Sequence, residues 1–145
     1  MLESLARGVH MKSFLQLKFI PLNPSLALLL LRLWLGGSML VLHGWPKLQK
    51  LVKGDFGFGD PLGIGAAPTF VLAVICEVLA SAFLIVGFLT RFSALLLAST
   101  MTVAWSVSHG MKLSGVGNGE LAFIYLGGYL ALLFAGAGKY SVEKS

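Results

Sequence analysis

Long apolar runs separated by short polar segments dominate this chain. Four of them lie at roughly Ser25–Gly44, Thr69–Leu89, Phe92–His109 and Gly119–Ala137. Each holds about 18–21 residues, and a helix of that length spans the hydrocarbon core of a bilayer, which is about 30 Å thick. The pattern predicts an all-α protein with four transmembrane helices in an antiparallel bundle.

The segments between the runs predict how the helices are connected. A glycine-rich loop over Gly54–Gly65 separates the first two helices. Thr90 and Arg91 leave almost no loop between the second and third, which therefore form a tight hairpin. Apolar and basic residues alternate over Trp45–Lys53, which is either a short helix on the membrane surface or a continuation of the first helix past Pro46.

The runs also divide the chain into parts. We expect an interfacial or cytoplasmic segment over residues 1–24, a transmembrane domain over 25–138 and a tail over 139–145. The first apolar stretch is too long for the core of a signal peptide and has no small-residue cleavage site, so we interpret it as a retained helix. Either Met1 or Met11 is a plausible start.

Composition supports the membrane class and excludes others. The chain is 57% hydrophobic and 12% charged, whereas a soluble domain has about 25% charged residues. Its single cysteine, Cys76, allows no disulfide within the chain and no CxxC pair. The net charge is +5, but the lysines lie at the ends of the runs, as membrane anchors do. We therefore expect the lipid bilayer, and not nucleic acid, as a partner.

Basic residues also predict the orientation. With the N-terminus inside, six lysines and arginines lie on the cytoplasmic side and four outside. The positive-inside rule then places both termini in the cytoplasm. The six are Arg7, Lys12, Lys18, Arg91, Lys139 and Lys144, and the four are Lys47, Lys50, Lys53 and Lys112.

Two charges lie inside apolar runs, namely Arg32 in the first and Glu77 in the second. A charge at membrane depth costs about 2.5–3.5 kcal/mol on insertion scales, so such residues are candidates for function. His43, His109 and Glu120 join them near the outer helix ends. Glu77 shares a stripe with small residues, which let helices approach closely, so we expect it to face the bundle interior.

The chemistry of these five residues stays open at this stage. Arg32 is the leading partner for Glu77 and His43 the alternative, and the pair is either structural or functional. The histidines also suit helix ends, and Glu120 suits a helix N-terminus. The sequence has no HxxxH or ExxH spacing, so we predict no metal site.

Four segments of the chain resemble the DoxX family of small four-helix membrane proteins. They are RLWLGGSMLVLHGWPKL, DPLGIG, ICEVLASAFLIVGFLTRFSAL and GNGELAFIYLGGYLALLFAGAGKYSVE. They occur in the family's order and cover nearly everything from Arg32 to Glu143. The resemblance implies a multi-pass protein of the bacterial inner membrane. The polar positions of the family match Arg32, His43, Lys47, Glu77, Arg91 and Glu120 of this chain.

The resemblance implies a redox association, because some relatives are the membrane part of a thiosulfate:quinone oxidoreductase. We favour a membrane subunit that supports a quinone- or sulfur-linked redox partner protein. The sequence identifies no cofactor, and a quinone between the helices fits this interpretation. The chain has no CxxCH motif and no flavin fingerprint, so it is not an electron carrier by itself. The alternative is a small permease or a purely structural membrane protein, and a homo-oligomer is compatible with both.

Overall fold

The computed structural model describes residues 11–143, and its regular elements within that range are all helical. The longest helix runs without interruption from Pro24 to Val52 and has 29 residues. It comprises α2 (Pro24–Ser38), the π-helical segment η1 (Met39–Gly44) and α3 (Trp45–Val52). The helix expected to end at Gly44 therefore continues past Pro46, as the second of the two sequence interpretations proposed.

The second long helix runs from Ala66 to Val86 and has 21 residues. It comprises α4 (Ala66–Ile75), the π-helical segment η2 (Cys76–Ala80) and α5 (Ser81–Val86). Pro68 lies in its first turn, where the missing N–H leaves no hydrogen bond unmade. These two helices are long and apolar enough to cross a membrane.

A short turn joins this helix to α6 (Thr90–Val103), which continues into the π-helical segment η3 (Ala104–Ser108). The turn occupies Gly87–Leu89, and Thr90 already belongs to α6, so the expected position of the turn at Thr90 and Arg91 was wrong. Gly87 has a φ of 72° and Leu89 a φ of 47°. This left-handed backbone, which glycine adopts without strain, reverses the chain direction within three residues.

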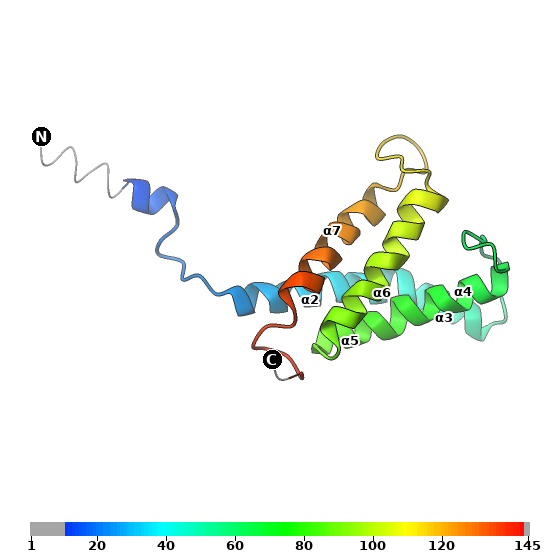
Figure 1. The fold of residues 1–145 in the computed structure, drawn as a ribbon, viewed down its shortest axis with the longest axis horizontal. Helices are drawn as coiled ribbons and strands as arrows, with labels where there is room; N and C mark the ends of the chain where they lie inside the picture. The colour runs from blue at the N-terminus through cyan, green and yellow to red at the C-terminus, as the bar shows by residue number, and fades with distance from the viewer. Residues whose placement is uncertain (1–10, 144–145) are drawn as a thin grey trace, which may run out of the picture.

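The last helix is α7 (Glu120–Ala135), a shorter apolar helix. It packs along α6, while α2 packs against both α5 and α7. Figure 1 shows α6 and α7 crossing the pair formed by the first two helices. The segment Gly136–Glu143 then turns back toward the end of the bundle where α5 meets α6, and Val142 N–H donates to the Val86 carbonyl at 3.1 Å.

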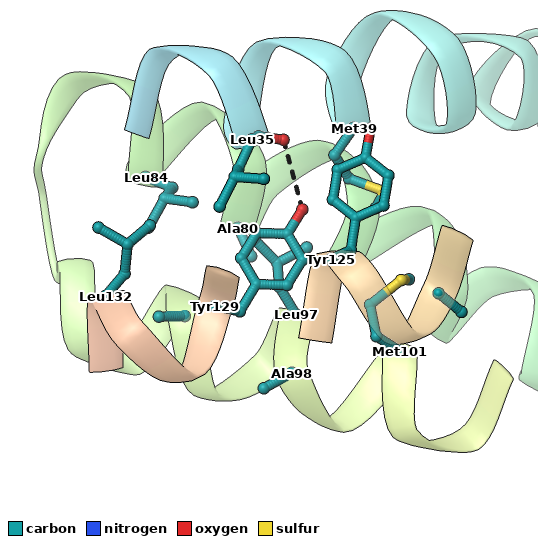
Figure 2. Packing of buried hydrophobic residues seen from close by; sticks show 12 residues of the cluster. Leu35, Met39, Ala80, Leu84, Leu97, Ala98, Met101, Tyr125, Tyr129 and Leu132 are labelled. Carbon is teal, nitrogen blue, oxygen red and sulfur yellow. Dashed lines mark hydrogen bonds between the residues drawn. The ribbon is translucent and has the colours of Figure 1, made fainter. Parts of the chain in front are cut away.

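The core lies where α2, α5, α6 and α7 meet (Figure 2). Tyr129 is fully buried there, and its hydroxyl donates to the Leu35 carbonyl at 3.3 Å. Tyr125, one turn earlier on α7, donates to the Ser38 hydroxyl at 2.8 Å. A buried phenol needs such an acceptor, so the two tyrosines fix the rotation of α7 relative to α2.

Candidate functional site

Glu77 forms an ion pair with Lys47 inside the protein. The Nζ atom of Lys47 lies 2.5 Å from both carboxylate oxygens. The Glu77 side chain is 4% exposed and that of Lys47 is 25% exposed. Glu77 is therefore buried in the bundle, as the stripe of small residues predicted, and it is held by a charge near one end of the bundle.

Lys47 is the partner that the sequence interpretation missed. It lies in α3, one helical turn beyond His43, in the segment that continues the first helix. The expected pairing of Glu77 with Arg32 was wrong. Arg32 lies more than three helical turns from Gly44, and Gly44 is the residue that packs against the Glu77 backbone. Lys47 matches a polar position of the family, and that match was the signal that could have identified it as the partner of Glu77.

Arg32 lies toward the opposite end of the bundle and binds the tail that follows α7. Its side chain is fully buried, and its Nη2 donates to the Tyr140 carbonyl. It packs directly over Gly87, since a Cβ added there would overlap the guanidinium. Arg32 Nε and Nη1 have no hydrogen-bond partner within residues 11–143. Arg32 thus joins the first helix to the tail and takes no part in the Glu77 site.

Two of the π-helical segments, η1 and η2, pack together at Glu77. Glu77 itself lies in η2, His43 lies in η1, and η1 packs on η2. A residue in a π-helix bonds to the carbonyl five residues before it, and such segments are frequent at functional sites. In the first helix the π-helix ends two residues before Pro46, which has no N–H to donate, and the Trp45 N–H bonds to the Leu40 carbonyl.

An apolar cavity of about 280 Å³ opens on one side of Glu77. Lys47, Glu77 and Cys76 line one part of it, and the residues of α6 and η3 line the opposite wall. Two hydroxyls of that wall, on Ser99 and Thr100, donate to carbonyls within α6 at 2.9 Å each. The Lys47–Glu77 pair is therefore the charged group that faces an otherwise apolar space.

The loop between α3 and α4 covers this cavity. Phe58, Pro61 and Leu62 from the loop line it. The Lys47 ammonium lies 5.6 Å from the centre of the Phe58 ring, a cation–π distance. These residues place the glycine-rich loop against the cavity that Glu77 lines.

Asp60 holds this loop in shape. Its carboxylate accepts hydrogen bonds from the Thr69 hydroxyl at 2.7 Å and from the N–H groups of Gly65 at 2.8 Å and Ile64 at 3.1 Å. These donors, the Thr69 hydroxyl first, lower the pKa of Asp60 below its ordinary value because they stabilise the ionised form. Asp60 therefore fixes the loop to the start of α4.

A second cavity of about 260 Å³ is also lined in part by Glu77. His43, His109, Asn118 and Tyr125 line it together with Glu77. The His43 ring meets the Tyr125 ring edge to face, with centroids 5.9 Å apart. Nδ1 of His109 lies 2.9 Å from the Gly117 carbonyl, which fixes that ring at the start of the loop to α7. The structure thus brings His43, His109 and Glu77 to one cavity.

Glu120 does not line either cavity, although the sequence grouped it with the outer cluster. It is exposed in the first turn of α7, where its own N–H is capped by the Asn118 side chain at 3.0 Å. A carboxylate there is favoured by the helix dipole. Within residues 11–143, no group of three histidine, cysteine or acidic side chains is arranged to hold a metal ion.

Comparison with known proteins places this site within a family. The DoxX family model matches residues 27–110, a range that includes both residues of the ion pair. A Haemophilus influenzae protein described as an uncharacterized protein is 30% identical, and the match covers 72% of this chain and 80% of the relative. No solved structure matches significantly. With its apolar helices and this match over more than half its length, the chain belongs to the DoxX family of membrane proteins.

Proposed function

We propose that this protein is the membrane subunit of a redox system and holds a quinone headgroup against Lys47 in the apolar cavity. The observation that carries the proposal is a single ion pair facing an apolar cavity between helices. A quinone is an apolar ring with two carbonyl acceptors. Its ring suits the apolar walls, and one carbonyl accepts a hydrogen bond from the Lys47 ammonium.

The same proposal includes four membrane-spanning helices and cytoplasmic termini. Two helices are both long and apolar enough for a span. The 16 residues of α7 measure about 24 Å, and local thinning of the bilayer accommodates such a helix. The six-to-four excess of basic residues supports cytoplasmic termini in a bacterial inner membrane.

Electrons have to come from a partner protein, because this chain has neither paired cysteines nor a flavin motif. Lys50 in α3 and Lys53, the residue that follows α3, are exposed and offer a basic surface for such a partner. A pull-down in mild detergent, followed by protein and quinone mass spectrometry, identifies the partner. Recovery of neither a redox protein nor a quinone would favour a permease or a structural protein.

The binding of the quinone itself tests the proposal. Decylubiquinone is titrated into purified protein, and the Kd is measured by quenching of tryptophan fluorescence. Lys47→Gln removes the donor and should weaken binding about tenfold or more, since a hydrogen bond from a charged group contributes about 1.5–3 kcal/mol. Lys50→Gln changes a lysine on the exposed side of the same helix and should leave the Kd unchanged.

Lys47→Gln also leaves Glu77 buried without its counter-charge, which can weaken the fold. The double variant Lys47→Gln/Glu77→Gln removes both charges and separates the two effects. Weak binding in a well-folded double variant supports the proposal. Wild-type affinity in that variant, or no binding of decylubiquinone to the wild type, contradicts it.

A further inference from the structure

The Glu77 side chain forms part of the wall of both cavities. Lys47 lines the apolar cavity with it, and His43 and His109 line the second cavity with it. A change in the partner of Glu77 at the apolar cavity therefore changes the electrostatic environment of the cavity that the histidines line. The two cavities are linked through one carboxylate.

His43 is the group on the second side best placed to respond. Lys47 lies one turn further along the same continuous helix, and Glu77 lies in η2, which packs on η1. Tyr125 of α7 presents its ring and keeps its hydroxyl on Ser38. His109 lines the same cavity, with Nδ1 engaged by the loop carbonyl of Gly117.

While the Lys47–Glu77 pair is intact, His43 is expected to be neutral. The negative charge of Glu77 is already balanced by Lys47. A proton on His43 would add a second positive charge near Lys47, inside an apolar bundle where an unbalanced charge is costly. The situation reverses once Lys47 turns to another acceptor, because Glu77 then lacks a counter-charge.

We propose that a quinone headgroup which takes the Lys47 hydrogen bond causes His43 to bind a proton, so that His43 replaces Lys47 as the counter-charge of Glu77. This inference rests on the proposed function, since the quinone occupies the same apolar cavity. The proton passes from bulk water to the free imidazole nitrogen of His43. No bond to the quinone forms, and no electrons move.

Calorimetry measures this proton. Decylubiquinone is titrated into the purified protein near pH 7 in phosphate and in Tris, whose ionisation enthalpies differ. The difference in binding heat gives the number of protons taken up, and we expect about one per bound quinone. The affinity should also rise by up to roughly tenfold for each pH unit of acidification between about pH 8 and 6, because binding takes up a proton.

His43→Gln and His43→Asn should still bind decylubiquinone, but with no proton uptake and a flat pH profile. His109→Gln should keep the uptake. Binding to the wild type without uptake, or uptake that survives in both His43 variants, overturns the inference and leaves the proposed function standing. Uptake lost in His109→Gln but kept in the His43 variants also overturns it. Absence of binding to the wild type contradicts the proposed function and this inference together.

Discussion

Gly44 packs directly against the backbone of Glu77. A Cβ added to Gly44 would lie 2.8 Å from the Glu77 carbonyl oxygen and 3.1 Å from the Val78 side chain. This contact brings the π-helical segments η1 and η2 together, and it sets Glu77 beside the helix that carries His43 and Lys47.

Gly44→Ala should therefore push the first two helices apart and lower the free energy of unfolding by about 1–3 kcal/mol. Gly37→Ala is the matched control, because no atom lies within 4 Å of its added Cβ. There the gain in helix propensity, about 1 kcal/mol, should raise stability. Thermal unfolding in detergent compares the two variants, and equal effects would contradict the packing argument.

The ion pair predicts coupling between Lys47 and Glu77. Each single change to glutamine leaves the other charge buried, which costs about 1–3 kcal/mol after allowance for the exposed part of Lys47. The double variant should lose clearly less than the sum of the two. Arg32→Gln combined with Glu77→Gln should lose the full sum, because those residues lie in separate parts of the bundle. Denaturant titration of the six proteins, wild type included, decides between coupling and additivity.

Asp60 predicts an acid-sensitive loop. Its folded pKa lies below the ordinary value of 3.8, so the stabilisation it provides is complete above that value and is lost as pH falls through the lower folded pKa. Stability measured from about pH 5 downward should show this loss in the wild type and lack it in Asp60→Asn. Thr69→Val removes the first donor and should move the loss to higher pH. Identical profiles of stability against pH for the wild type and both variants would contradict this role of Asp60.

The tail should contribute to stability through its backbone. Truncation after Gly138 removes the Tyr140 carbonyl from the buried Arg32 and uncovers the end of α5. We expect a loss of about 1–3 kcal/mol, the cost of a buried donor without a partner. Tyr140→Ala keeps the carbonyl and removes only a half-exposed ring, so it should be nearly neutral. A large loss in Tyr140→Ala would show that the ring, and not Arg32, anchors the tail.

Topology can be tested with single cysteines in a Cys76→Ser background. Ser114 lies in the exposed loop between η3 and α7, and Lys139 lies beyond α7. With cytoplasmic termini, a membrane-impermeant maleimide applied to intact cells should label Ser114→Cys and not Lys139→Cys. The reverse pattern would invert the orientation.

Much of the fold follows from the sequence because its signal is local. Apolar runs bounded by prolines and glycines predict the last three helices to within about three residues, whereas the first extends to Val52, eight residues past its expected end. The inward orientation of Glu77 also follows, since a stripe of small residues and a buried carboxylate favour the same face. The continuation of the first helix past Pro46 was left open, because a proline at that point is compatible with both a helix end and a locally changed helix.

Counting along ideal α-helices did not identify the partner of Glu77, because the helical period changes at the site. Face assignments at i+4 and i+7 assume an α-helix, but η1, η2 and η3 widen the turn just where the site lies. The sequence pattern also does not predict the pairing of Arg32 with Tyr140, because the acceptor is a backbone carbonyl and any residue type supplies one.

The bond between Arg32 and the Tyr140 carbonyl has a consequence for biosynthesis. The two residues are 108 positions apart, and chains elongate at about 5–20 residues per second. Arg32 is therefore synthesised about 5–20 seconds before its acceptor exists. During this interval the first helix carries an uncompensated charge, so membrane insertion of this helix depends on its own apolar residues, and the end of the bundle at Arg32 and Tyr140 closes last.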